Sequence, residues 1–348
     1  MKILLVGDWR YEIYEKAMSV AITKFNINII PLKTLKFKKD FLWKYRAALP
    51  FFDFYKSKLN KKIIKKAKYH KPNFVLFWRP THILPKTILQ LSKMNIKTIS
   101  YNNDDPFGPK IHKIAPWHHH FLWYYYIKCL PYFDFNFFYR KINCIESKAE
   151  GARHADLLLP YFIPSKDRYI KLTAKEKKKF QTDIVFIGHY EPDGRENLIN
   201  ELINENYKLK LWGGKYWTQK VLGKNYKKLL PIKEVSGDDY IKALCGAKIC
   251  LAFLSKLNRD NYTRRCFEIP ACGKVMLAER TKELTKLFKE DVEACFFSSK
   301  KELLIKVNWL LKNPKIRKSI GNAGKARVWK DGHDINSRAN EFIKKLKL

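Results

Sequence analysis

The chain has few acidic residues for its length. In 348 residues, 33 Asp and Glu stand against 70 Lys and Arg, which gives a formal net charge of +37 at pH 7. Such a shortage of negative charge predicts an anionic partner: nucleic acid, an acidic lipid surface or a phosphorylated substrate. The lysine-rich usage of an AT-rich genome would also account for part of the excess, without any specific partner. The charge alone leaves these alternatives open.

Ordered pairs of cysteines and long apolar runs are also missing. The seven cysteines are scattered and include no CxxC pair, which excludes a zinc ribbon or a disulfide framework and favours a reducing cytoplasm. No uncharged apolar stretch approaches the roughly 18 residues that a membrane span requires. The apolar run near the N-terminus meets Asp8 and Arg10 at once, so it predicts a buried strand and not a signal peptide. We therefore expect a cytoplasmic protein, with a peripheral position at the inner membrane face as a possibility.

A third absence concerns the first predicted strand, Lys2 to Gly7, which is not followed by a GxGxxG motif. This disfavours a dinucleotide-binding fold of the usual kind. A helix over 11–25 and a strand over 27–31 still predict an open, doubly wound α/β sheet, with its functional edge at the carboxyl ends of the strands. A second α/β pattern starts at Asp183, and a chain of this length accommodates two domains.

The richest motif is the stretch 260–278, DNYTRRCFEIPACGKVMLA, in which Arg264 and Arg265 lie between Asp260 and Glu268. Carboxylates accept hydrogen bonds from vicinal sugar hydroxyls, and guanidinium groups neutralise a diphosphate. Gly273 would let the backbone approach a ligand closely. The same spacing also fits an ordinary helix start with an ion pair from Arg264 to Glu268, and the pattern alone does not decide between the two.

Residues 265–278, RCFEIPACGKVMLA, resemble the C-terminal signature of the CgeB-like glycosyltransferases, which belong to the GT-B enzymes. The resemblance implies two Rossmann-like domains facing each other across a cleft, with a C-terminal helix returning to the first domain. It further implies a nucleotide-diphosphate sugar as donor, no metal and no other cofactor. Glu268 would bind the donor ribose, and Asp260, where the family often has Glu, would face the transferred sugar. Such an acid pair suggests retention of anomeric configuration.

On this basis we predict four segments. An acceptor-binding domain spans 1–165, a linker 166–182 and a nucleotide-sugar-binding domain 183–334, while 335–348 forms the returning helix. The predicted donor site combines diphosphate-binding arginines, glycine turns at strand ends and a side chain near the base or ribose. Its members are Gly188, His189, Arg195, Gly213, Gly214, Tyr240, Arg264, Arg265, Glu268 and Gly273.

Two acids end a predicted strand of the first domain. Asp104 and Asp105 follow the strand over 97–101, and Pro106 stops it. Carboxylates at that edge would position an acceptor hydroxyl, or deprotonate it if the reaction inverts configuration. Simple turn chemistry is the alternative. A metal-binding acidic motif of the GT-A type is disfavoured by the C-terminal signature.

Two further stretches bear on the acceptor. Between Lys33 and Lys71, fourteen basic residues face only Asp40 and Asp53, and residues 115–139 are rich in Trp, Tyr, Phe and His. Together they suggest a surface for anionic lipid and a cell-envelope or lipid-linked glycan as acceptor. The alternatives are a solvated helix face and ordinary core packing. A glycosyltransferase acting on nucleic acid bases and a non-catalytic nucleic-acid-binding protein are the competing functions. The oligomeric state is not predicted.

Overall fold

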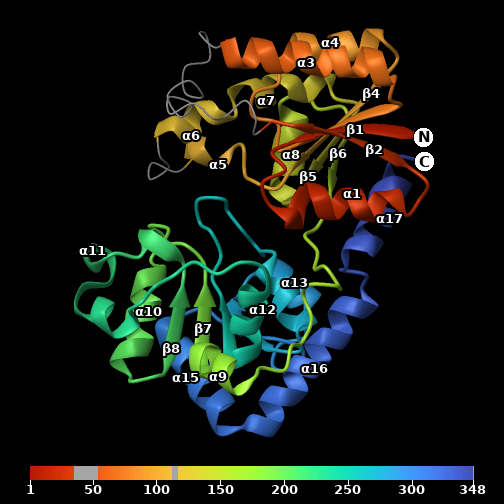
Figure 1. Ribbon diagram of the computed structural model, residues 1–348. Helices are drawn as coiled ribbons and strands as arrows, with labels where there is room; N and C mark the ends of the chain where they lie inside the picture. The colour runs from red at the N-terminus through yellow and green to blue at the C-terminus, as the bar shows by residue number, and fades with distance from the viewer. Residues whose placement is uncertain (35–53, 112–116, 348) are drawn as a thin grey trace. The chain divides into compact units, whose positions relative to one another are not determined.

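The computed structural model describes residues 1–34, 54–111 and 117–347 (Figure 1). The chain divides into two compact units. Unit 1 comprises Met1–Leu159, Leu257–Arg259 and Ile335–Leu348, and unit 2 comprises Pro160–Lys256 and Asp260–Asp334.

Unit 1 is built on a six-stranded parallel sheet with the order β2-β1-β3-β4-β5-β6. Its strands are β1 (Lys2–Gly7), β2 (Asn28–Lys33), β3 (Phe74–Trp78), β4 (Lys97–Asn102), β5 (Phe135–Phe138) and β6 (Ala155–Leu157). β3 is buried at every position, as expected for a parallel strand covered on both faces. The chain runs outward from β1 to β2 and then returns to β3 on the other side of β1. The β1/β3 junction is therefore the switch point at which doubly wound sheets bind ligands.

The aromatic run of 115–139 contributes several rings to the core, whereas Phe121 and Tyr132 are exposed. Trp123, Tyr126, Phe133 and Phe138 are all less than one-tenth exposed and belong to the hydrophobic core of unit 1. Their rings pack against one another, with Tyr126 and Phe133 6.4 Å apart between centroids. The expectation that this run lies at a membrane interface is wrong for these residues, because their rings fill the sheet–helix interior. Among the described residues, no helix is both long and apolar enough to cross a membrane.

The helices of unit 1 surround this sheet and include the last helix of the chain. They are η1 (Glu12–Lys16), α1 (Ala17–Thr23), α3 (Phe54–His70), α4 (Pro85–Lys93), α5 (Gly108–Ile111), α6 (Trp117–Leu122), α7 (Tyr124–Cys129), η3 (Leu130–Tyr132), α8 (Lys141–Ala149) and α17 (Ile335–Lys345). α17 packs on α1, and its Phe342 ring lies 5.2 Å from that of Phe137 in β5. The predicted return of the C-terminal helix to the first unit is confirmed.

Unit 2 contains a five-stranded parallel sheet with the order β11-β10-β9-β7-β8. Its strands are β7 (Thr182–Ile187), β8 (Leu209–Trp212), β9 (Ala247–Ala252), β10 (Val275–Glu279) and β11 (Cys295–Phe297). Its helices are α9 (Ala174–Phe180), α10 (Arg195–Asn204), η4 (Gly214–Tyr216), α11 (Gln219–Leu222), η5 (Gly223–Leu229), α12 (Gly237–Gly246), α13 (Arg265–Ala271), α14 (Lys282–Leu287), α15 (Lys300–Lys312) and α16 (Pro314–Lys330). The switch point lies between β7 and β9, and the predicted α/β class with two parallel sheets is confirmed.

The segment predicted as a linker, 166–182, is instead part of unit 2. It contains α9, which starts with a capping box in which Thr173 and Glu176 bind each other's backbone N–H. Phe180, at the end of α9, is buried and packs on Trp212 with ring centroids 5.8 Å apart. The lysine-rich composition suggested a linker because α9 is short and has one buried residue, Phe180. A single apolar residue changes the average composition of the segment little.

Candidate functional site

Arg265 spans the switch point of unit 2. It lies in the first turn of α13, and its guanidinium donates to the carbonyl of Phe253, just beyond β9, at 3.3 Å. The same group lies over the ring of Phe186 in β7, 5.8 Å from the centroid. Its Nε is buried and has no hydrogen-bond partner within the described chain. A buried guanidinium nitrogen without an acceptor is costly, so this position favours an anionic ligand.

Glu268 lies one turn further along α13, where it binds two side chains. Its Oε1 accepts a hydrogen bond from Arg264 Nε at 2.5 Å, and its Oε2 accepts one from the Tyr240 hydroxyl at 2.6 Å. The carboxylate is 5% exposed. The ion pair proposed as the structural alternative is therefore present, and a ribose at Glu268 would have to share or displace the bond from Tyr240. Burial, together with the charge of Glu268, holds the pKa of Tyr240 well above its usual value, so the hydroxyl stays a donor.

Asp167 is the member of this cluster that sequence reasoning missed. Its carboxylate lies 3.2 Å from Arg264 Nη2 and accepts a hydrogen bond from the backbone N–H of Ile163 at 2.6 Å. Burial, reinforced by the nearby charge of Glu268, raises the pKa of Asp167 to about 7. Asp167 is far from Arg264 in sequence and belongs to no local motif, so only the folded chain brings the two together.

The predicted glycine turns approach each other. Gly188 follows β7, and its N–H donates to the carbonyl of Trp212 at 2.7 Å. A Cβ on Gly213 would overlap the Gly188 carbonyl oxygen, and one on Gly214, which has φ +70°, would overlap Glu234. The groups that approach Gly213 and Gly214 closely therefore include the protein's own backbone and the Glu234 side chain.

Gly273 has a structural role that differs from the predicted one. It ends α13 with φ +68°, and its N–H donates to the carbonyl of Pro270 at 2.7 Å. A Cβ on Gly321 of α16 would meet the Gly273 carbonyl oxygen at 2.6 Å. Gly273 thus ends α13 in the left-handed conformation common at helix C-termini, and helix α16 packs against its backbone.

Arg195 and His189 also depart from expectation. The Arg195 guanidinium is 3% exposed and forms a fork with Asp193, at 2.8 and 2.5 Å, while Nη1 donates to the carbonyl of His189 at 2.9 Å. It holds the loop before α10 in place, so its charge is already matched by carboxylates, and a direct diphosphate contact is disfavoured. The His189 side chain is mostly exposed and lies 3.3 Å from Glu191.

The loop that carries Asp260 is closed by its own backbone. The N–H of Asp260 donates to the carbonyl of Ser255 at 2.9 Å, and the residue is partly exposed. Asp260 therefore stays accessible between β9 and α13, whereas Glu268 is buried within α13. The sugar-facing role of Asp260 stays a prediction.

A hollow of about 520 Å³ lies at the carboxyl ends of β9, β10 and β11 in unit 2. Gly194, Lys256, Ser298 and Lys300 line it, together with the start of α10. The Lys256 ammonium donates to the carbonyl of Asp193 at 2.6 Å. Backbone amides at a helix start and lysine side chains suit an anionic or hydroxyl-bearing ligand.

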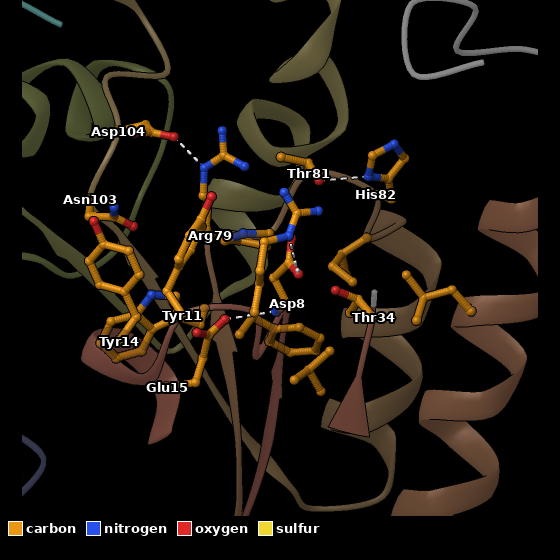
Figure 2. Close-up of a pocket in the computed structure, with 17 residues that line it drawn as sticks. Asp8, Tyr11, Tyr14, Glu15, Thr34, Arg79, Thr81, His82, Asn103 and Asp104 are labelled. Atoms are coloured by element: carbon orange, nitrogen blue, oxygen red, sulfur yellow. Dashed lines mark hydrogen bonds and ion pairs between the residues drawn. The ribbon is translucent and has the colours of Figure 1, made fainter. Parts of the chain in front are cut away.

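A second cavity, of about 320 Å³, lies at the β1/β3 switch point of unit 1 (Figure 2). Arg79, after β3, binds Asp104, after β4, and its terminal nitrogens point away from that carboxylate in Figure 2. Burial would raise the pKa of Asp104, but the adjacent Arg79 guanidinium outweighs burial and lowers it. Asp104 is therefore ionised at neutral pH.

Aromatic and carboxylate side chains complete this cavity. Tyr14, Trp78 and Glu15 line it, and Glu15 accepts a hydrogen bond from the N–H of Asp8 at 2.7 Å. Burial raises the pKa of Glu15. Thr81 Oγ1 lies 2.6 Å from His82 Nδ1 at another part of the wall. Ring faces combined with hydroxyl-binding polar groups suit a sugar.

Backbone strain marks both strands of this switch point. Trp9 has φ 59° after β1, and Arg79 has φ 49° after β3. Bulky side chains rarely occupy the left-handed region, at a cost of order 1–3 kcal/mol each, and such strain gathers at functional sites. Neither residue was predicted, because no residue type signals a strained conformation.

The two adjacent acids Asp104 and Asp105 have different surroundings. Asp105 is 1% exposed, and its Oδ1 accepts hydrogen bonds from the N–H groups of Phe107 and Gly108 at 3.0 and 2.9 Å. Arg259 binds the same carboxylate at 2.5 Å and also Glu146 at 2.7 Å. Asp105 thus holds the start of α5, and a role as general base is disfavoured. Asp104 lines the cavity, as its position at the strand end predicted.

Comparison with known proteins agrees with this architecture. Residues 195–344 match the family described as glycosyl transferase-like, whereas no curated protein matches the sequence. Sucrose-phosphate synthase from Thermosynechococcus elongatus matches with a TM-score of 0.71 at 10% identity, covering 100% of this chain and 98% of that chain. Anabaena HepE in complex with UDP and glucose gives 0.67 at 11%, covering 100% and 99%. A putative UDP-N-acetylglucosamine 2-epimerase from Listeria monocytogenes gives 0.62 at 13%, covering 99% and 95%. The chain therefore has the fold of these enzymes, and its residues 195–344 are similar to a glycosyl transferase-like family.

Proposed function

We propose that the protein transfers a sugar from a UDP-sugar, bound by unit 2, to a glycan acceptor bound by unit 1, with retention of anomeric configuration. HepE, a protein of the same fold, has been solved with UDP and with UDP-glucose, which supports this donor. Epimerases of the same fold also act on UDP-sugars, so fold alone does not choose the reaction. The glycosyl transferase-like domain over 195–344 favours transfer.

The observation that carries the proposal is Arg265. Its buried Nε has no partner in the described chain, and its guanidinium lies between the carboxyl ends of β7 and β9. A UDP diphosphate would satisfy this nitrogen and neutralise the charge. As the sugar leaves, negative charge grows on the diphosphate, and a fixed guanidinium stabilises that charge without reorganisation. This is the role that a divalent ion has in other transferases.

The remaining roles follow from position. Glu268 would accept hydrogen bonds from the ribose hydroxyls, with Arg264 and Tyr240 fixing its orientation. Asp260, which is partly exposed in the loop before α13, would face the transferred sugar. In unit 1, Asp104 and Arg79 would orient the acceptor hydroxyls, because together they offer both hydrogen-bond acceptors and donors.

For the acceptor we propose a cell-envelope or lipid-linked glycan. The cavity of about 320 Å³ in unit 1 has room for a terminal sugar and not for a polymer, so the rest of the glycan would extend outside. The rings of Tyr14 and Trp78 offer the flat apolar surfaces on which sugars stack.

Ligand-induced thermal stabilisation tests the donor assignment. UDP at 100 times its dissociation constant should stabilise the wild type by about 2.7 kcal/mol, and Arg265→Gln should abolish most of the shift. Lys248→Gln is the matched control, since it removes one positive charge at the opposite, amino-terminal end of β9. Absence of a shift with every nucleoside diphosphate would refute the proposed donor. Stabilisation by DNA or RNA instead would favour the nucleic-acid alternatives.

A further inference from the structure

Helices α3 and α4 of unit 1 present a surface with positive charge only. Their sequences contain nine lysines and neither an acidic residue nor an arginine. Seven of the lysines are exposed: Lys58, Lys61, Lys62, Lys65, Lys68, Lys86 and Lys93. We call these seven the lysine face. The two helices lie side by side (Figure 1), and within the described ranges no carboxylate pairs with the lysine face.

A groove of about 560 Å³ runs between the two helices. Lys61, Lys65 and Lys68 of α3 line one side of it, at the four- and three-residue spacings that align side chains along a helix. Lys86 of α4 lines the groove as well, with Ile64 among its apolar members. The groove therefore combines cationic groups with an apolar contact surface, a combination that suits an amphiphile better than a simple ion.

A buried amide connects this groove to the strained cavity. Asn60 of α3 is 4% exposed; its Nδ2 donates to the carbonyl of His82 at 3.0 Å, and its Oδ1 accepts from the N–H of Leu84 at 3.1 Å. His82 lines the cavity of Figure 2, while Asn60 and Leu84 line the groove. The loop after β3 thus lines both the cavity, through His82, and the groove, through Leu84.

We propose that the lysine face binds the headgroups of an acidic phospholipid surface. Lysine is a compact point charge suited to a diffuse anionic layer, whereas recognition of individual nucleic acid phosphates and bases favours the guanidinium fork, which both helices lack. Two exposed apolar side chains follow the lysines at helical spacing: Tyr69, 83% exposed, lies four residues after Lys65, and Leu89 lies three residues after Lys86.

The inference deepens the proposed function in one respect. A lipid surface at the groove would bring a lipid-linked acceptor to the neighbouring cavity, because both share the loop after β3. The binding itself needs no sugar donor and no turnover, so it can be tested apart from catalysis.

Co-sedimentation of the full-length protein with vesicles tests the proposal. We expect binding to phosphatidylcholine vesicles containing phosphatidylglycerol and none to pure phosphatidylcholine. A surface lysine contributes about fivefold to such binding, so a triple variant, Lys61→Gln, Lys65→Gln and Lys86→Gln, should weaken it roughly 100-fold. The control is Lys315→Gln, Lys318→Gln and Lys330→Gln on α16 of unit 2, which removes the same charge from another acid-free helix and should leave binding within a few-fold of wild type.

Three results would overturn the inference: equal weakening by the two triple variants, equal binding to both kinds of vesicle, or tighter binding of RNA that is lost in the first variant alone. Thermal melting of each variant, with and without UDP, shows that the fold and the donor domain are intact. Vesicle binding without any UDP shift would leave the lipid surface standing and refute the proposed donor.

Discussion

The two switch points of this protein differ in how their polar groups are satisfied. In unit 2, Glu268, Arg264, Asp167 and Tyr240 bind one another, and the adjacent Arg265 has a buried Nε with no hydrogen-bond partner among the described residues. In unit 1, charged and aromatic groups surround an open cavity, and the backbone at its edge is strained. The closed cluster suits fixed electrostatic stabilisation of a leaving group, whereas the open cavity suits an exchangeable substrate. Changes in unit 2 should therefore affect donor binding and transfer, and changes in unit 1 acceptor use.

The largest effect is expected for Arg265→Gln. Removing a fixed charge from a developing diphosphate costs on the order of 3 kcal/mol, or about 100-fold to 1,000-fold in kcat. Transfer from UDP-glucose to water or to a supplied glycan would be measured alongside UDP binding. Arg265→Lys should recover part of the rate because it keeps the charge. A full rate in Arg265→Gln would remove this residue from catalysis.

Asp105→Asn should mainly affect stability. Arg259 would lose one of its two carboxylate partners and keep Glu146, and the lost carboxylate is 1% exposed; breaking such a buried pair costs up to about 3 kcal/mol. Thermal or urea unfolding would measure the loss, with Asp104→Asn as the neighbouring control that should cost clearly less. A normal melting curve combined with abolished transfer would instead restore Asp105 as a catalytic base.

Asp104→Asn should reduce acceptor use without changing donor binding. Asn keeps the shape of the side chain but loses the charge that pairs with Arg79, so we expect a fall of roughly 10-fold to 100-fold in kcat/KM for the acceptor. The UDP shift should match that of the wild type. If the UDP shift disappeared as well, the separation of donor and acceptor roles between the units would be wrong.

The smallest effect concerns pH. The pKa of Asp167 is raised to about 7 in the folded protein from an ordinary value of 3.8, so the folded state holds a proton that the unfolded state has released. Its contribution to stability is therefore greatest below about pH 4 and falls as the pH rises towards 7. Relative to wild type, Asp167→Asn should become more stable on going from pH 5 to pH 8. Parallel melting temperatures across that range would contradict the raised pKa.

Much of the unit 2 site could be predicted from the sequence because its motif is contiguous. Arg264, Arg265 and Glu268 fall within one helical turn of each other, so their proximity follows from helix geometry alone. Asp167 and Tyr240 could not be linked to them, since they come from distant segments. Gly273 was assigned to ligand approach because a glycine turn looks the same in sequence whether a ligand or helix α16 lies beside it.

Of the residues that line the unit 1 cavity, only Asp104 was predicted from the sequence as a site residue. Its walls come from the ends of four strands, β1, β2, β3 and β4, and from η1. The strain at Trp9 and Arg79 has no sequence signature. The aromatic run was read in part as an interfacial surface because Trp and Tyr occur both at interfaces and in cores, and burial in the folded chain distinguishes the two.

By itself the sequence determined the α/β class, the two doubly wound sheets and the Arg/Glu motif, since periodicity, strand-ending residues and helical spacing are local properties. Only the tertiary structure decided which charges are already paired. Arg195 and Asp105 are enclosed by partners, Asp104 faces a cavity, and Arg265 has a buried nitrogen with no partner in the part of the chain that the structure describes. The reason is physical. The energy of a charged group depends on burial and on neighbours within a few ångströms, and the fold supplies those neighbours from distant parts of the chain.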